Sequence, residues 1–215
     1  MNNNNIVIGS PVKGQWAIMN PPGHPKLGYD FLAVDDRKNP YRRGYFLRHL
    51  FSPISVTNTL AWSQPVFAPL DSVVAESHDG SPDRRRINMV YDLIRLLVFR
   101  PKPGSPFSAY GGNYILLKCD GVHVLLAHLR CGSIRVKPSD IVRAGDQLGE
   151  VGNSGSSLQP HLHLQVMENG RLFPLFANLL PVSLRIAHKK IDGEWIQKTN
   201  TPLMNGDHLR LQVNA

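Results

Sequence analysis

Two histidines, His161 and His163, stand two residues apart in a stretch that has the composition of a β-strand. Residues i and i+2 of a strand point to the same face, so both imidazoles would enter one pocket, as a metal site requires. The preceding segment, 153–160, is rich in turn-forming residues, and Pro160 suits the first position of a strand. The spacing is typical of a metal-binding pair and equally of two strand histidines satisfied by hydrogen bonds.

Three further residues would complete a metal site. Asp30 begins the apolar strand 28–33, where a carboxylate needs a cation or hydrogen-bond donors nearby. His24 lies six residues earlier in a loop of proline and glycine, and His128 ends another predicted strand. Two imidazoles and one carboxylate, with a fourth position left to water, are a ligand set suited to catalytic zinc. Zinc lowers the pKa of its bound water and polarises a carbonyl, while further imidazoles move protons or stabilise an oxyanion.

The elements that must position these residues are mostly short strands, so the fold class is expected to be mainly β. Apolar segments alternate with glycine, proline, asparagine and aspartate. The strongest hairpin signal is Asp120-Gly121, which joins the segments 113–119 and 122–129. Further strands are predicted on either side of a turn within 66–75 and at 134–136, 141–142, 147–151 and 161–167.

One segment, Arg86 to Phe99, has apolar residues at helical spacing and is followed by Pro101 and Pro103 as stops. It predicts one inserted helix near residues 86–99, which packs on the sheet or, alternatively, serves as a lid or touches a membrane. The tail, 182–213, contains a hairpin pattern and would either extend the main sheet or form a small β appendage.

Length and composition limit the function. The 215 residues suit one domain with a substantial core, or one domain with a short appendage. The formal net charge of +8 favours anionic partners, including an acidic wall polymer. The arginine runs 42–43 and 84–86 lack aromatic interleaving or a known motif, so a nucleic-acid partner is not expected. No transmembrane segment and no signal peptide is visible, which leaves the cytoplasm or export by another route.

The order of motifs resembles the lysostaphin-type zinc endopeptidases, and the likeness covers roughly residues 16–176. The matching motifs are G-x-D-F from Gly28, P-V-F-A-P-L-D-S-V-V from Pro65, A-H-L from Ala127, V-x-x-G-D-Q-L-G-x-V-G-N-S-G from Val142 and P-H-L-H-L-Q-V from Pro160. The resemblance implies an antiparallel β-sheet groove of the duplicated hybrid motif fold that holds one zinc. It also implies hydrolysis of peptide bonds, in many members those of peptidoglycan cross-links or stem peptides.

Carried over to the matching positions, the resemblance implies that Asp30 and His163 are zinc ligands. It implies that His128 and His161 flank the metal as catalytic histidines. The expected division of the chain is a peptidase domain at 1–181 and a C-terminal β extension at 182–215.

The chain departs from the family at the first histidine. In the pattern H-x-G-x-D this position is occupied by Lys26, and the nearest histidine, His24, lies two residues earlier. We therefore expect His24 to be the third ligand of one zinc ion per chain. If it is not, the alternative is a non-catalytic groove-binding or regulatory module of the same fold, and a basic nucleic-acid-binding protein is the third hypothesis. The remaining histidines, expected to be surface or packing residues, are His49, His78, His123, His188 and His208.

Overall fold

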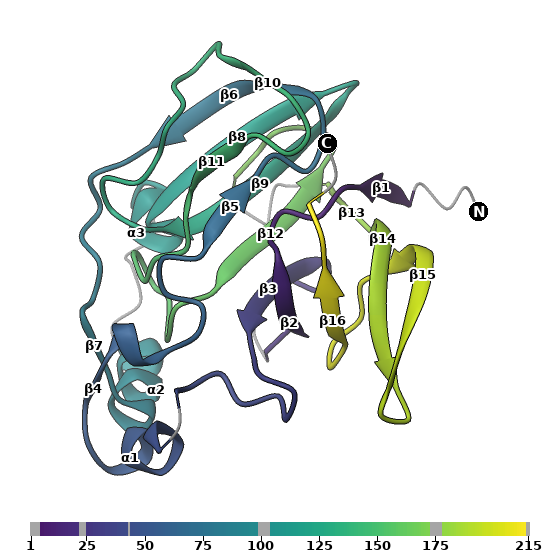
Figure 1. Ribbon diagram of the computed structural model, residues 1–215. Helices are drawn as coiled ribbons and strands as arrows, with labels where there is room; N and C mark the ends of the chain where they lie inside the picture. The colour runs from purple at the N-terminus through teal and green to yellow at the C-terminus, as the bar shows by residue number, and fades with distance from the viewer. Residues whose placement is uncertain (1–4, 22–24, 43, 99–103, 173–177, 214–215) are drawn as a thin grey trace.

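The computed structural model describes residues 5–21, 25–42, 44–98, 104–172 and 178–213. A single 12-stranded sheet forms most of the molecule, and two small two-stranded sheets accompany it (Figure 1). The strands are β1 Ile6–Ile8, β2 Gly14–Met19, β3 Gly28–Ala33, β4 Ile54–Ser55, β5 Pro65–Phe67, β6 Ser72–His78, β7 Arg86–Ile87, β8 Asn113–Cys119, β9 Val122–Leu129, β10 Ile141–Val142, β11 Gln147–Glu150, β12 Leu162–Met167, β13 Leu179–Leu180, β14 Val182–Ile191, β15 Glu194–Pro202 and β16 His208–Leu211. The helices are α1 Tyr45–Phe51, α2 Met89–Val98 and α3 Ser108–Gly111, with a 3-10 turn, η1, at Val56–Asn58.

The predicted mainly β class is confirmed. Along the large sheet the order is β1-β14-β16-β2-β3-β12-β9-β8-β6-β10, with β13 beside β12 and β15 beside β14. The sheet is mixed rather than wholly antiparallel, because β1 pairs with β14 in the parallel direction. The hairpin at Asp120-Gly121 forms as expected, and both turn residues have positive φ, 41° and 81°, as a type I′ turn requires.

The central strands β3 and β12 are buried along their whole length because both faces of the sheet are covered. Leu162 and Leu164 of β12 point into the main core, where they meet Phe31 of β3. Met167 points to the opposite face, where a smaller apolar cluster includes Leu125 of β9. Since side chains alternate along a strand, the polar residues between the leucines of β12 belong to this second face.

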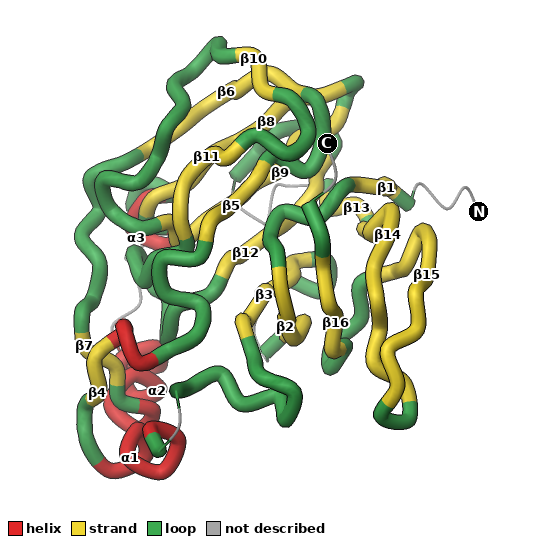
Figure 2. The backbone as a smooth tube through the Cα atoms, viewed as in Figure 1, coloured by secondary structure: helices red, strands yellow, loops and turns green. Residues whose placement is uncertain are grey.

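A group of short elements stands apart from the sheet, at the lower left of Figures 1 and 2. We call residues 41–58 and 84–98 the helical lobe; it holds α1, β4, η1, β7 and α2. The predicted inserted helix is confirmed, but it begins at Met89 because Arg86 and Ile87 pair with β4 instead. Helix α1 was not expected from the sequence.

Two further predictions have a definite outcome. The strand expected at 134–136 is wrong: the backbone N–H groups of Gly132 and Ile134 donate to the Asp79 carboxylate, and this stretch forms no ladder. The tail extends the main sheet, with β14 beside β1 and β16 beside β2. The division at 181/182 stays a prediction.

Candidate functional site

Asp30 and His163 face each other across two neighbouring strands. They are directly opposite in the antiparallel register of β3 and β12, so their side chains share one face. His163 Nδ1 lies 2.9 Å from Asp30 Oδ1, and both side chains are buried. The strand register therefore brings together the two residues that the sequence predicted as metal ligands.

His161 joins them from the residue just before β12, as the two-residue spacing predicted. Its Nδ1 lies 2.8 Å from the Gln159 carbonyl and 3.1 Å from Ser157 Oγ. A carbonyl only accepts, so Nδ1 carries the proton and Nε2 of the neutral ring has a lone pair. That Nε2 is buried and lies 3.4 Å from Asp30 Oδ1. Burial lowers the pKa of His161, but the charge and hydrogen bonding of Asp30 outweigh burial and raise it.

His128 reaches the same face through a β-bulge. Between Tyr114 and Asn113 strand β8 advances by one residue, while β9 advances by two, from Ala127 to Leu129. His128 is the extra residue of this bulge. Its φ is 62°, a backbone conformation that residues other than glycine adopt only at a cost in free energy. The bulge interrupts the alternation along β9 and brings the ring to 4.7 Å from that of His161, centroid to centroid.

The protonation of His128 is fixed by its surroundings. Its Nδ1 donates to the Ser154 carbonyl at 3.0 Å, which leaves the lone pair on Nε2. Burial, and then the nearby imidazoles of His161 and His163, hold its pKa well below the ordinary value, so this ring is neutral. The Asp30 pKa is also held well below its ordinary value, because the charges and hydrogen bonds of His161 and His163 overcome the effect of burial. The site thus combines a carboxylate with a neutral imidazole.

Gln165 supports the site and was not predicted. It lies on β12 two residues after His163, is buried, and donates from Nε2 to the Leu172 carbonyl at 3.4 Å. Its Oε1 therefore faces His163 Nε2, 3.2 Å away, and accepts the proton on that nitrogen. The Asp30 carboxylate only accepts, so without a cation the 2.9 Å contact requires a proton on His163 Nδ1; a metal ion would replace that proton, while Gln165 accepts the one on Nε2. The period of two along β12 could have suggested this contact.

The predicted first ligand lies outside the described residues, because His24 falls within 22–24. Lys26, at the position where the family has histidine, is exposed in the turn before β3. The Asn20 side-chain amide holds this turn by donating to the carbonyls of Pro25, Lys26 and Gly28, at 2.9, 3.2 and 2.8 Å. The Lys26 side chain therefore does not substitute for an imidazole at Asp30.

The donors fit a metal ion in part. His161 Nε2 and His163 Nδ1 both face the Asp30 carboxylate, which only accepts, so a proton or a cation must lie between each nitrogen and the carboxylate. Within the described ranges, however, no group of three or more His, Cys, Asp or Glu residues is arranged to hold an ion.

The other histidines fall into two groups. His49 and His208 are buried packing residues, whereas His78, His123 and His188 are half-buried. Ring contacts join His49 to Tyr41, His78 to Tyr114 and His208 to Trp195. The expectation that they pack or lie near the surface is consistent with these positions.

Comparison with known proteins points to one family. Residues 98–174 match peptidase family M23, and this segment includes His128, His161 and His163. Lysostaphin from Staphylococcus staphylolyticus is 43% identical over 60 residues, which is 27% of this chain and 12% of that protein. The chain thus matches only about an eighth of the length of that relative.

Solved structures give weaker likenesses. A putative M23 peptidase from Pseudomonas aeruginosa has a TM-score of 0.45 and 18% identity, covering 84% of this chain and 50% of the other. The catalytic domain of lysostaphin from Staphylococcus simulans has a TM-score of 0.40 and 21% identity, covering 82% and 90%. The family match over residues 98–174 and the lysostaphin match indicate that this part of the chain is similar to the lysostaphin-type peptidases of family M23.

Proposed function

We propose that the protein is a zinc-dependent endopeptidase that hydrolyses peptide bonds in peptidoglycan cross-links or stem peptides. The observation that carries the proposal is the convergence of two imidazole nitrogens, His161 Nε2 and His163 Nδ1, on the buried Asp30 carboxylate. Such a site is costly without a cation. The M23 family match supports peptidase chemistry.

His24, Asp30 and His163 would hold the metal in this proposal. A bound zinc supplies Lewis acidity and a water of lowered pKa. Gln165 Oε1 accepts the proton on His163 Nε2, so Nδ1, which faces Asp30, is the nitrogen that would bind the metal. The neighbouring hydrogen bonds thereby fix the ligand in the tautomer that a metal requires.

His128 and His161 would act on protons and charge. His128 is neutral, and its Nε2 lone pair is available to accept a proton from the attacking water. The pKa of His161 is raised, so its ring more readily carries a second proton on Nε2 and can donate to the oxygen that gains charge when a carbonyl is attacked. The carbonyls of Ser154 and Gln159 orient the two rings.

The peptidoglycan substrate rests on the family resemblance and on charge. The formal net charge of +8 suits a wall that contains anionic polymer. No helix in the described parts of the chain has the length and apolar character of a membrane span.

The decisive experiment compares His24→Ala with Lys26→Ala. We expect the full chain to bind about one zinc ion, because the proposed site is mononuclear. We also expect it to cleave purified peptidoglycan. Because two remaining donors chelate weakly, His24→Ala should lower zinc affinity by orders of magnitude, while Lys26→Ala should bind normally. Calorimetric zinc titration and release of peptide fragments give the two readings. Equal zinc affinity of His24→Ala and the parent protein would refute the ligand assignment.

A second function is favoured by one observation: among the described residues no group of three or more His, Cys, Asp or Glu residues is arranged to hold an ion, and Lys26 is exposed. If the parent protein binds peptidoglycan fragments without zinc and without cleavage, it is a non-catalytic groove-binding or regulatory module of the same fold.

A further inference from the structure

The helical lobe carries most of the net positive charge of the protein. Its sequence, 41–58 and 84–98, contains seven arginines, no lysine, one aspartate and no glutamate. This gives the lobe a formal net charge of +6, compared with +8 for the whole chain. The one acid, Asp92, is buried and forms an ion pair with Arg84, so it does not offset the exposed arginines.

The same lobe exposes an apolar helix face. On α2, Val90 is 55% exposed, Leu93 52% and Ile94 53%, and Met89 at the start of the helix is 39% exposed. At about 100° per residue these four side chains occupy a continuous arc of about 140°. Phe51, at the end of α1, is 85% exposed. Solvent-facing aliphatic side chains on one helix face are unfavourable unless something covers them.

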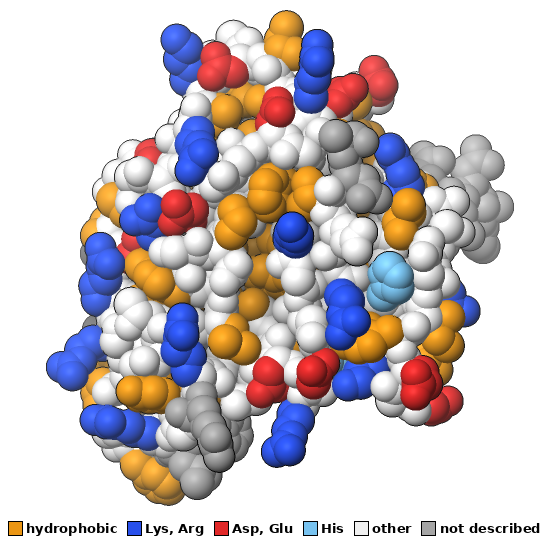
Figure 3. All heavy atoms as spheres, viewed as in Figure 1, with side chains coloured by type: hydrophobic (Ala, Val, Ile, Leu, Met, Phe, Trp, Pro, Cys, Tyr) orange, Lys and Arg blue, Asp and Glu red, His pale blue; other side chains and the backbone are white. Residues whose placement is uncertain are grey.

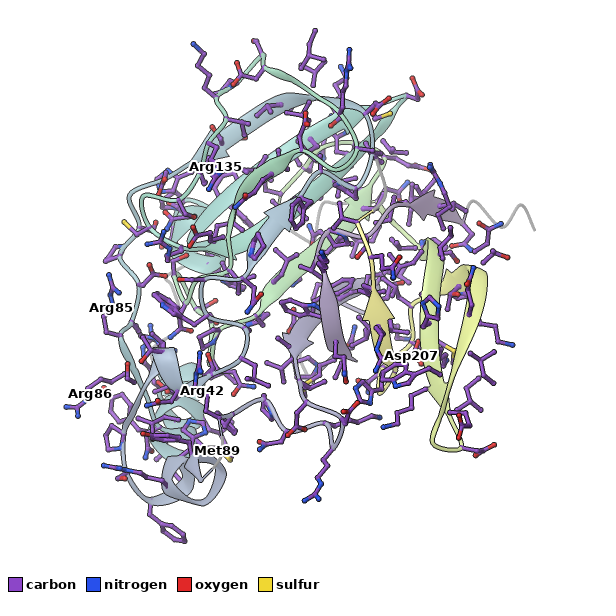
Figure 4. All side chains as sticks on the ribbon, viewed as in Figure 1. Arg42, Arg85, Arg86, Met89, Arg135 and Asp207 are labelled. Atoms are coloured by element: carbon purple, nitrogen blue, oxygen red, sulfur yellow. The ribbon has the colours of Figure 1, made fainter. Side chains whose placement is uncertain are left out.

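Exposed arginines lie on the same lobe as this apolar face. Arg42, Arg48, Arg85 and Arg86 are all exposed. Figure 3 shows hydrophobic and basic side chains gathered together at the end of the molecule formed by the lobe. In Figure 4 Arg42, Arg85, Arg86 and Met89 all lie on this lobe, and Arg86 extends away from the protein.

We propose that the helical lobe docks on an anionic lipid surface, with the apolar face of α2 in the interface and the arginines at the phosphate level. This is the chemistry of interfacial amphipathic helices, which combine a basic border with a buried apolar face. At ten residues α2 is too short to cross a bilayer and suits a position in its surface.

Charge and apolar surface together favour an anionic lipid over a second copy of the chain or a nucleic acid. A second copy would bring two lobes of the same strong positive charge together, which opposes self-association. A nucleic acid would match the charge but would leave Val90, Leu93 and Ile94 against phosphates, where aliphatic side chains gain nothing. Anionic lipid matches both the charge and the apolar arc.

The lobe adjoins the segment that leads to the candidate site. Tyr41 Oη donates to Gln159 Oε1 at 2.6 Å, and an Arg84 guanidinium nitrogen donates to the Leu158 carbonyl at 3.2 Å. A docked lobe would therefore place the approach to His161 near the lipid surface. The docking itself does not depend on the peptidase proposal.

The test is co-sedimentation of the full chain with large unilamellar vesicles. Vesicles of phosphatidylglycerol and phosphatidylcholine should retain the protein, whereas pure phosphatidylcholine should not. Binding should weaken between low and high salt, because salt screens the arginines. Failure to bind anionic vesicles at low salt, or equal binding to both compositions, would overturn the proposal.

Paired variants test the apolar face. Leu93→Gln/Ile94→Gln should weaken vesicle binding by at least about tenfold, since two apolar side chains would no longer enter the interface. The matched control is Ile141→Gln: Ile141 is 82% exposed on β10, at the opposite end of the molecule in Figure 1, and should leave binding unchanged. Equal effects of lobe and control variants would refute docking through α2.

A second pair tests the charge. Arg85→Gln/Arg86→Gln should weaken binding by roughly 25-fold, at about fivefold for each arginine near the surface. Arg135→Gln/Lys137→Gln removes the same charge from exposed positions outside the lobe and should have little effect. Unchanged thermal unfolding would show that all variants are folded. Concentration-dependent dimers that Leu93→Gln/Ile94→Gln abolishes, or DNA binding in place of vesicle binding, would contradict the proposal.

Discussion

Replacing Gln165 by methionine should weaken zinc binding, although Gln165 is not expected to touch the metal. The side chain is buried, and its Oε1 is 3.2 Å from His163 Nε2. Without this acceptor the ring keeps a buried unsatisfied N–H, which costs about 1–3 kcal/mol. Alternatively, its proton moves to Nδ1, which lies 2.9 Å from Asp30 Oδ1, and the ligand nitrogen is lost. Both routes lower the zinc affinity, by about 10–100-fold for a residue that hydrogen-bonds a metal ligand.

The assay is calorimetric titration of zinc into protein stripped with a chelator. Nitrogen NMR of the His163 ring in the metal-free protein separately reports which nitrogen carries the proton. Gln165→Glu is the matched control, because its carboxylate still accepts from Nε2 and should preserve both the tautomer and most of the affinity. If Gln165→Met binds zinc as tightly as the parent and keeps the proton on Nε2, the assigned role of Gln165 is wrong.

Three other perturbations give sharp expectations. His163→Ala should lose zinc, whereas His161→Ala should largely keep zinc but lose turnover. Elemental analysis and a cleavage assay check this, and equal zinc loss in the two variants would contradict the assignment of His163 as ligand and His161 as catalytic residue. Arg84→Met should destabilise the protein by about 3 kcal/mol in denaturant unfolding, because it leaves the buried Asp92 carboxylate unpaired, and Arg84→Met/Asp92→Leu should recover most of that loss. Burial lowers the pKa of His49, although the charge of Asp92 acts in the opposite direction. As the pH falls below about 6.5, the unfolded chain therefore binds more protons than the folded one. The free energy of unfolding should decline in this pH range. His49→Phe should show a smaller decline between pH 7.5 and 5.5, and an identical one would refute the assignment.

The sequence predicted best where a period or a turn type determines the structure. Asp120-Gly121 specifies a tight hairpin, and the hairpin fixes the pairing of β8 with β9. The two-residue spacing of His161 and His163 places both on one face, and the register of β12 with β3 then brings Asp30 to them. These are local rules, and tertiary packing did not override them.

The conformation of His128 could not be read in the same way. A strict alternation along β9 would place His128 with Leu126, on the side of the main core. The bulge rotates it to the other face at φ 62°, and no glycine marks the position in Ala127-His128-Leu129. Bulges of this kind store strain that the surrounding structure stabilises, so they follow from packing across the whole sheet and not from the local sequence.

The proposed third ligand, His24, is also difficult to predict from the local sequence, because it belongs to a loop. Asp30 and His163 are constrained because strands repeat every two residues, and a shift of one residue would turn either side chain to the wrong face. A loop has no such period, so the two-residue displacement from Lys26 to His24 does not by itself exclude a ligand. The Asn20 amide, which holds the carbonyls of Pro25, Lys26 and Gly28, fixes the end of this loop next to Asp30. Zinc titration of His24→Ala determines whether His24 is the third ligand.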